Sequence, residues 1–180
     1  AESFFETEYE TDQFIYEYTK PIIAVLDGVV MGGGVGIAYG ASHRIVTEKT
    51  KWAMPEMNIA FFPDVGAAYF LNKTPGAVGK YLALTAATIP AEDVIYANAA
   101  DLFCSTEKLP QLVEAIENEN WLEGSTEDKL TDLFNEYGEE APKEDTLEGL
   151  QEQIDKHFAN RDTVEEIVES LESDDSEFAE

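Results

Sequence analysis

Residues 27–66 read DGVVMGGGVGIAYGASHRIVTEKTKWAMPEMNIAFFPDVG, and this stretch decides the fold. The apolar run at residues 22–26, just before it, predicts a buried strand. A triple glycine at residues 32–34 follows, and the pattern after it predicts a helix over residues 33–41. The first N–H groups of such a helix lack intrahelical acceptors and favour negative charge. Glycine lets a ligand approach these groups because it has no Cβ.

Two carboxylates follow prolines later in the stretch. Glu56 comes after Pro55 and Asp64 comes after Pro63, each in a mostly apolar segment. A backbone N–H donor and two carboxylates are the components of a site for acyl transfer or proton transfer. Each feature alone also has a structural explanation, because glycine permits close packing and proline with an acid is common in turns. Their combination in this order favours a site.

Several motifs resemble the crotonase (enoyl-CoA hydratase/isomerase) superfamily, and within it the 3-hydroxyisobutyryl-CoA hydrolase branch. They are KPIIA at residues 20–24, DG at 27–28, MGGGVG at 31–36, AMPE at 53–56, FPDVG at 62–66, FFETEY at 4–9 and TVEEI at 163–167. The resemblance therefore covers nearly the whole chain. Gly36 stands where hydratases of the superfamily usually carry a second glutamate, so a plain hydratase is the weaker interpretation. An enoyl-CoA isomerase stays an alternative, because one carboxylate can move a proton.

The resemblance implies an α/β fold, a partial crotonase-like spiral of strand–strand–helix units followed by a mainly helical segment. We expect a partial crotonase-type core over residues 1–106 and an acidic helical segment of the same family region over residues 107–180. The residue patterns predict the individual elements. Helices are expected over residues 3–19, 65–73, 76–85 and 91–97, strands over 43–47, 51–54 and 99–103, and four further helices marked by Leu109, Leu130, Leu147 and Val164.

The resemblance also implies an activity, the hydrolysis of the thioester of a short branched 3-hydroxyacyl-CoA, as in valine degradation. Glu56 and Asp64 would be the catalytic residues, with Glu56 attacking the carbonyl or activating water. Asp64 would bind the substrate hydroxyl or position that water. We expect no separate cofactor, because coenzyme A is part of the substrate. Further residues would bind the substrate: Gly33 through its N–H to the thioester oxygen, Gly32 and Gly34 by shaping the turn, and Glu8 of FFETEY by lying close to it.

The chain departs from the family pattern at both ends. Family members take a second oxyanion donor from an earlier loop, usually with an AGG sequence, and no such sequence precedes Lys20. Members of the branch also continue beyond the position of Glu180. The chain therefore resembles an internal fragment, which would have little activity in isolation. A different class of function, a non-catalytic acidic assembly module, is the alternative that this departure favours.

The charge and the cysteine content limit the partners and the compartment. The 180 residues carry a net charge of −27, and residues 107–180 hold 25 acidic and 5 basic side chains against 13 and 6 in residues 1–106. This charge disfavours nucleic acid as a partner, and no apolar run is long enough to span a membrane. An acyl-CoA is the expected small-molecule partner, and a homo-oligomer is left open.

The single cysteine, Cys104, allows no disulfide within one chain and suits a reducing compartment. We expect the cytoplasm if the source is bacterial, and mitochondrial targeting stays open because residue 1 is not methionine. His43 is one of only two histidines, and we expect it at a strand end rather than as a base. Because no serine partner is expected near it and no cluster has the spacing of metal ligands, neither a catalytic triad nor a metal site is assigned.

Overall fold

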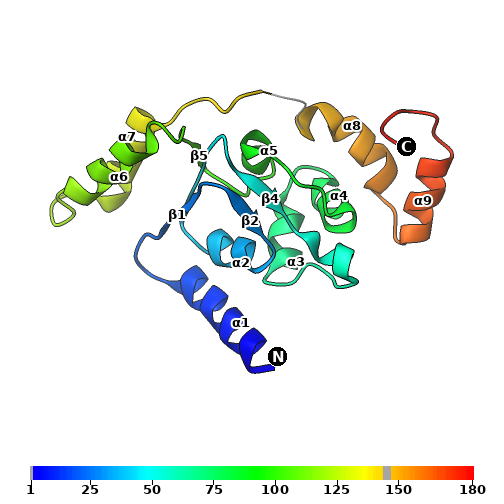
Figure 1. Ribbon diagram of the computed structural model, residues 1–180, viewed down its shortest axis with the longest axis horizontal. Helices are drawn as coiled ribbons and strands as arrows, with labels where there is room; N and C mark the ends of the chain where they lie inside the picture. The colour runs from blue at the N-terminus through cyan, green and yellow to red at the C-terminus, as the bar shows by residue number, and fades with distance from the viewer. Residues whose placement is uncertain (1, 144–146) are drawn as a thin grey trace.

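The computed structural model describes residues 2–143 and 147–180, and the strands in these residues form two small parallel sheets. The strands are β1 (Ile23–Leu26), β2 (Val29–Met31), β3 (His43–Val46), β4 (Lys51–Ala53) and β5 (Leu102–Phe103). The larger sheet has the order β1–β3–β5, with Ile23 opposite His43, and the smaller one pairs β2 with β4. Figure 1 shows the strands at the centre of the molecule, with helices around them.

Consecutive strands divide between the two sheets. The strands β1 and β3 belong to the larger sheet, whereas β2 and β4 belong to the smaller one. The helix α2 (Gly33–Tyr39) lies between β2 and β3 and supplies the crossover that parallel neighbours require. The chain therefore forms a strand–strand–helix unit, β1–β2–α2, followed by the strand pair β3–β4. The α/β class predicted from the sequence is confirmed.

The strand β2 corrects the sequence prediction, which placed the glycine turn directly after the apolar run at residues 22–26. The chain turns at Gly28, which has a φ of +136°, and the next three residues pair with β4 before the glycines begin. Three residues are too few to show a periodicity of two, so the pattern of the sequence contained no sign of this strand.

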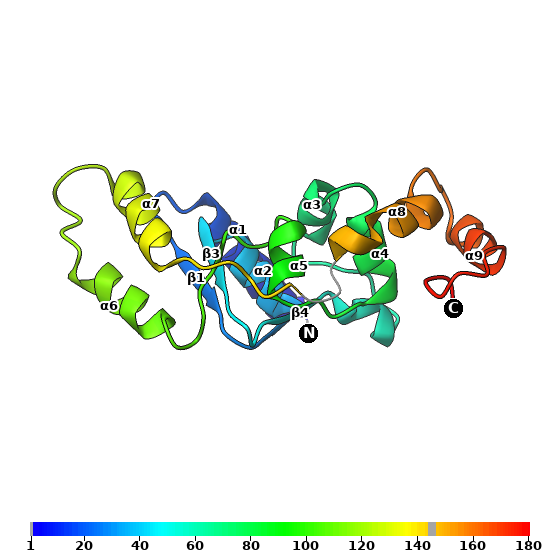
Figure 2. The same ribbon diagram turned by 90° about the horizontal axis from the view of Figure 1, so that it is seen from above.

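Helices extend the molecule at both ends, as Figures 1 and 2 show. One end holds α6 (Leu109–Asn118) and α7 (Thr126–Tyr137), and the other holds α8 (Leu147–Phe158) and α9 (Val164–Glu172). The helices α4 (Val78–Thr85) and α5 (Ala91–Tyr96) lie between the strands and α8. In the described residues beyond position 107, the only β-type pairing is an isolated bridge from Glu139 to Phe103. The mainly helical character of this second part is thus confirmed.

Two clusters of buried apolar side chains form the core. The larger one contains Trp52 and Leu82, at 2% and 0% exposure, and reaches Ile154 of α8. The smaller one joins Ile45 of β3 to Leu112 of α6. Both clusters include residues from beyond position 107, because the apolar stripes of the acidic helices face inward and their charges face solvent.

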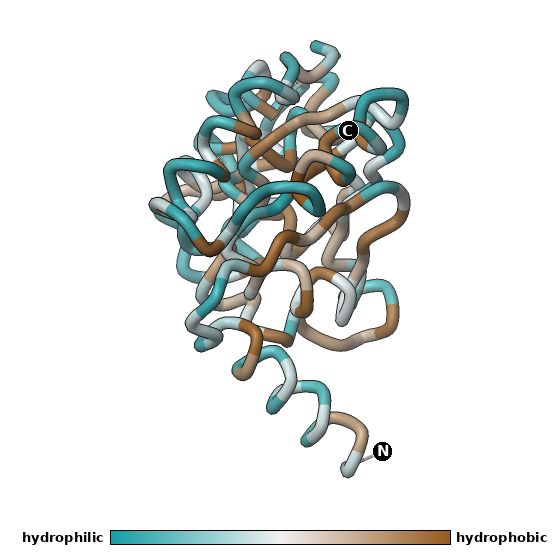
Figure 3. Tube along the Cα trace, turned by 90° about the vertical axis from the view of Figure 1, so that its left-hand side faces the viewer, coloured by the Kyte–Doolittle hydropathy of each residue, from teal (hydrophilic) through white to brown (hydrophobic). Residues whose placement is uncertain are grey.

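The first helix, α1 (Glu2–Glu17), confirms the prediction over residues 3–19 but packs little of its aromatic surface. Phe4 is 64% exposed and Phe14 is 63% exposed. Figure 3 shows α1 extending away from the rest of the chain. None of the helices in residues 2–143 and 147–180 combines the length and the apolarity that crossing a membrane requires. The contacts that α1 does make therefore have to hold it in place.

The helix predicted over residues 65–73 is divided in the structure. It consists of α3 (Ala67–Phe70) and the 3₁₀ turn η2 (Leu71–Lys73), and another 3₁₀ turn, η1 (Pro55–Ile59), follows β4. The hydroxyl of Thr74 accepts the Gly79 N–H at 2.7 Å and donates to the Leu71 carbonyl at 2.9 Å. These bonds end the helix and bring α4 against the end of η2.

Both histidines pair with serines, so the expectation that none would do so near His43 was wrong. His43 begins β3, as predicted, and its Nδ1 lies 2.8 Å from the hydroxyl of the adjacent Ser42. The fully buried His157 contacts Ser170 through Nδ1 at 2.9 Å and Asp174 through Nε2 at 2.8 Å. A hydrolase triad uses the opposite nitrogens for serine and aspartate. The hydrogen bonds of His157 therefore join α8 to α9 and to the segment after α9.

The contact between Gly79 and Leu71 leads to a stability test. A Cβ at Gly79 would collide with the Leu71 carbonyl, so we expect Gly79→Ala to lower the free energy of unfolding by about 1–3 kcal/mol in urea denaturation. Gly149→Ala in α8 is the matched control, since an added Cβ there meets no described atom within 4 Å and alanine favours helix by up to about 1 kcal/mol. Equal stability of the two variants would contradict the packing of α4 on η2.

Candidate active site

The glycine turn between β2 and α2 leaves backbone donors unused. Gly32 has a φ of +53°, its N–H donates to the Ala53 carbonyl at 3.2 Å, and its own carbonyl accepts the Val35 N–H at 2.8 Å. The N–H groups of Gly33 and Gly34, the first two residues of α2, have no acceptor among the described residues. The turn therefore presents two adjacent donors at a helix start, where developing negative charge is favoured.

Glu56 lies directly against this turn. It follows Pro55 at the start of η1, just after β4, and the pairing of β4 with β2 brings it to the end of β2. Its side chain is buried, and a Cβ added to Gly32 would lie 3.0 Å from Glu56 Oε1. Glu56 Oε2 has no hydrogen-bond partner among the described residues. Burial raises the pKa of Glu56 and the nearby Asp64 raises it further, although a bond from its own backbone N–H opposes them.

Asp64 is held by a residue that sequence reasoning missed. The Tyr9 hydroxyl of α1 donates to Asp64 Oδ2 at 2.6 Å. This bond, with a smaller effect of burial and of nearby carboxylates, raises the pKa of Tyr9 to about 12. The Asp64 carbonyl accepts the Ala67 N–H at 2.7 Å and so begins α3. Tyr9 follows Glu8 in the motif FFETEY, which is the one sign that could have identified it.

Glu8 and Asp12, one turn apart on α1, lie against α2 at Gly33 and Gly36. Glu8 Oε1 occupies the space that a Cβ on Gly33 would need. A Cβ on Gly36 would lie 2.9 Å from Asp12 Oδ2 and 2.5 Å from the Cβ of Val65. Asp12 was also missed in the sequence, where it is one acid among many. Gly34 differs, because a Cβ there would meet Val30 at 4.0 Å, an ordinary contact.

Val65, which packs against Gly36, has a left-handed backbone. Its φ is +42°, a conformation that is costly for a β-branched residue, by about 1–3 kcal/mol. Gly66 follows with a φ of +85° and accepts this conformation without such a cost. The two residues turn the chain sharply after Asp64, so that Asp64 faces α1 while α3 leads away.

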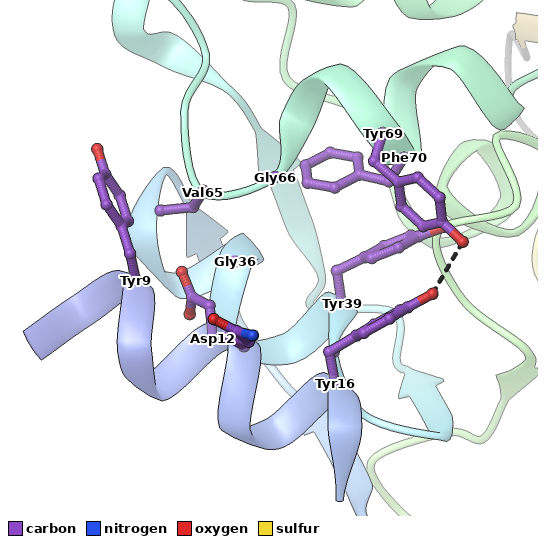
Figure 4. A pocket seen from close by; sticks show the side chains of 11 residues that line it. Tyr9, Asp12, Tyr16, Gly36, Tyr39, Val65, Gly66, Tyr69 and Phe70 are labelled. Carbon is purple, nitrogen blue, oxygen red and sulfur yellow. Dashed lines mark hydrogen bonds between the residues drawn. The ribbon is translucent and has the colours of Figure 1, made fainter. Parts of the chain in front are cut away.

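A cavity of about 330 Å³ lies beside the glycine turn, between α1, α2 and α3. Its lining is mostly apolar and aromatic, and Figure 4 shows Tyr16, Tyr39 and Phe70 around it. The residues that line it include neither Glu56 nor Gly33, so the cavity adjoins the turn without covering it. In the described ranges no group of three or more His, Cys, Asp or Glu side chains has the arrangement of a metal site.

The arrangement brings Glu56 and Glu8 against the glycine turn and places Asp64 beside α1. Glu56 contacts Gly32, Glu8 contacts Gly33, and Asp64 is joined to α1 next to Glu8 through Tyr9. Chemically, the unused N–H groups can stabilise charge on a carbonyl oxygen, and a buried carboxylate with one free oxygen can take a proton or attack a carbonyl carbon.

Comparison with known proteins identifies the family. The family model described as enoyl-CoA hydratase/isomerase matches residues 1–180, and the chain belongs to that family. A crystal structure described as a carnitinyl-CoA dehydratase from Mycobacterium thermoresistibile is 33% identical with a TM-score of 0.86, over 98% of this chain and 49% of that one. The crotonase-like fold and the resemblance stated from the motifs are thus confirmed.

The chain is similar to relatives whose names describe two different kinds of protein, an enzyme and a ribosomal protein. A Danio rerio protein named 3-hydroxyisobutyryl-CoA hydrolase, mitochondrial, is 38% identical over 179 residues, which are 99% of this chain and 47% of that protein. A Neurospora crassa protein named small ribosomal subunit protein mS47 is 41% identical over 143 residues, 77% of this chain and 28% of that protein. The chain therefore spans less than half the length of these two relatives.

The bond between Tyr9 and Asp64 can be tested by titration. We expect Asp64→Asn to lower the pKa of Tyr9 from about 12 toward the ordinary value near 10, because the amide no longer favours the protonated phenol by charge. The tyrosine signals would be followed by NMR against pH and Tyr9 assigned with Tyr9→Phe. Glu10→Gln, an exposed neighbour on α1, is the control and should leave the titration unchanged. A Tyr9 that titrates identically with and without Asp64 would show that the two side chains are apart.

Proposed function

We propose that the complete protein containing this sequence hydrolyses an acyl-CoA thioester of the 3-hydroxyisobutyryl-CoA type. The observation that carries the proposal is the buried Glu56 carboxylate against Gly32, whose Oε2 has no hydrogen-bond partner among the described residues, beside the unused Gly33 N–H. Family membership and the relatives named 3-hydroxyisobutyryl-CoA hydrolase support the class of substrate. Those relatives are also named mitochondrial, which supports a mitochondrial location if the source is eukaryotic.

In this proposal the thioester carbonyl lies against the start of α2. The Gly33 N–H donates to the carbonyl oxygen and stabilises the charge that grows there as the carbonyl carbon becomes tetrahedral. One such donor typically contributes about two to three powers of ten in rate. The helix start is suited to this role because its donors are fixed before the substrate arrives.

Glu56 supplies the second part of the chemistry. Its carboxylate either takes a proton from water as the water oxygen bonds to the carbonyl carbon, or itself bonds to that carbon and is then released by water. In both routes the carbon–sulfur bond breaks, the sulfur takes the proton, and the products are the free acid and the thiol of coenzyme A. Glu56 must be ionised to act, and its pKa is raised. We therefore expect kcat/KM to increase as the pH rises through the pKa of Glu56.

Asp64 is suited to recognising a hydroxyl on the acyl group by accepting its hydrogen bond. The Tyr9 bond fixes one of its oxygens, Oδ2, and Asp64 Oδ1 stays available as an acceptor. Glu8, at the Gly33 side of α1, would border the same substrate. A fixed acceptor discriminates better than a mobile one, because a substrate without the hydroxyl leaves it unpaired.

A second candidate function is a non-catalytic role in an assembly. The 41% identity to the protein named small ribosomal subunit protein mS47 favours it, since that name assigns the relative to an assembly, the small ribosomal subunit. The acidic helices beyond residue 107 would then supply the contact surface for a basic partner. The two candidates differ in one observable property, which is the turnover of acyl-CoA esters.

The activity test uses Glu56→Gln in the complete protein. The amide keeps the shape of the side chain but removes the charge, so we expect thiol release from 3-hydroxyisobutyryl-CoA to fall by about two to four powers of ten while ester binding persists. The measurement is the appearance of free coenzyme A thiol, and Glu10→Gln serves as the control of unchanged rate.

The wild-type protein and the variant together decide between the two candidates. Full hydrolysis by Glu56→Gln would assign the chemistry to another residue. No hydrolysis by the wild-type protein with any short acyl-CoA would contradict the enzyme proposal and favour the assembly role.

The role of Asp64 is tested by its own substitution. We expect Asp64→Asn to lower kcat/KM for 3-hydroxyacyl esters by about one to two powers of ten, the size of one hydrogen bond to a charged group. The rate for the same ester without the hydroxyl should change less. Equal losses for both esters would show that Asp64 positions the water instead of reading the hydroxyl.

A further inference from the structure

Asp12 is a half-buried acid for which the proposed reaction has no use. Its side chain comes from the middle of α1 and points toward Gly36 and Val65, as Figure 4 shows. Both of its carboxylate oxygens are buried, and neither has a hydrogen-bond partner among the described residues. A carboxylate in such a place loses its hydration without gaining a partner, so its protonated form fits the place better.

The groups that face Asp12 come from every element packed around it, and none of them carries a positive charge. Glu8 approaches from its own helix and Asp64 from the turn before α3. The cavity next to Asp12 is otherwise lined by neutral residues: Tyr9, Gln13, Tyr16, Gly36, Tyr39, Gly40, Val65, Gly66, Tyr69 and Phe70. Lys73, which donates to the Tyr69 hydroxyl, does not line this cavity. Burial, and then Glu8 and Asp64, raise the pKa of Asp12 to about 6.

The helix that carries Asp12 is held by few contacts. Tyr9 bonds to Asp64, and the Tyr16 hydroxyl lies 2.9 Å from that of Tyr69. Ile15 packs closely over Gly40, where a Cβ would lie 3.1 Å from it. The large aromatic side chains near both ends of α1 are exposed and add little packing. An ionised Asp12 carboxylate in this small interface between α1 and α2 would therefore affect the position of the whole helix α1.

We propose that Asp12 is a positioning residue whose protonated carboxyl seats α1 on α2 and Val65. The seated helix holds Glu8 against Gly33 and Tyr9 against Asp64. The effect of the seated helix on catalysis rests on the proposed hydrolase function, whereas the seating itself is a property of the fold. Asp12 thus acts on the reaction through Glu8 and Asp64 and touches no reacting atom.

The sign of the pH effect follows from the raised pKa of Asp12. The seated form prefers the proton, so its advantage is complete below the ordinary value of 3.8. That advantage is lost as the pH rises from 3.8 to about 6, where Asp12 ionises even in the seated helix. Above that range ionised Asp12 weakens the seating to a constant extent.

The seating is tested by hydrogen exchange of the complete protein at pH 5.5 and pH 8, with rates corrected for the intrinsic effect of pH. We expect the protection of the α1 amides in the wild-type protein to fall by about fourfold between these pH values, because much of the advantage is already lost at pH 5.5. Asp12→Asn, which copies the protonated acid, should remove most of this fall. Asp12→Leu, neutral and of similar size, should do the same, and Glu10→Gln on the same helix should behave like the wild type.

A kinetic measurement separates positioning from simple stability. The ratio of kcat/KM for Asp12→Asn to that of the wild type should rise by up to about fourfold from pH 5.5 to pH 8, because the contribution of Glu56 cancels in the ratio. An identical pH dependence of α1 protection in the wild type and in both Asp12 variants would overturn the proposal. If no variant hydrolyses acyl-CoA, the proposed function fails, and hydrogen exchange alone decides the seating.

Discussion

The structure around the glycine turn depends on one steric constraint, which is the space that the missing Cβ atoms of Gly32, Gly33 and Gly36 leave free. The space beside each of them is taken by a carboxylate: Glu56 at Gly32, Glu8 at Gly33 and Asp12 at Gly36. The constraint is firmest at Gly36, where an added Cβ would lie 2.5 Å from the Cβ of Val65 and 2.9 Å from Asp12 Oδ2 of α1. The missing Cβ atoms thus set the distance between the two helices and bring acids to unused N–H donors.

The electrostatic state of the turn follows from this crowding. Glu8, Asp12, Glu56 and Asp64 lie around α2, and none of them has an ion pair with Lys or Arg within the described residues. Burial then works with like charges to raise the pKa of Glu56 and of Asp12. Perturbed acids of this kind are commoner at functional sites than in ordinary surfaces, which favours a chemical role for the turn. Much of the acidity beyond residue 107, in contrast, lies on solvated helix surfaces.

The sequence predicted the parts of the structure that depend on local pattern. The long helices, the strands β1, β3 and β4 and the glycine turn all agree with it in type, because apolar periodicity and glycine placement encode them. It missed β2, which has only three residues and takes its identity from pairing with β4. It also joined α3 and η2 into one helix, because a change from α-helical to 3₁₀ hydrogen bonding leaves no mark in the apolar pattern.

The candidate site was predictable only in part for a related reason. Glu56, Asp64 and the glycines lie within one stretch of 40 residues whose motifs resemble a known family. Tyr9 and Asp64, however, are 55 residues apart, and their contact depends on the direction in which α1 crosses α2. Asp12 is one of 38 acids, and only its position against Gly36 distinguishes it. Contacts of this kind follow from the tertiary arrangement and have no local signature.

The central claim is that the Gly33 N–H and the Glu56 carboxylate act on the same carbonyl. The most direct measurement is a structure of the complete protein with a short acyl-CoA analogue in which a methylene group replaces the thioester sulfur, so that the carbonyl persists without hydrolysis. The account predicts a carbonyl oxygen about 2.7–3.1 Å from the Gly33 nitrogen, with the Glu56 carboxylate facing the carbonyl carbon. A carbonyl bound away from Gly33, or a Glu56 side chain directed away from it, would contradict the account.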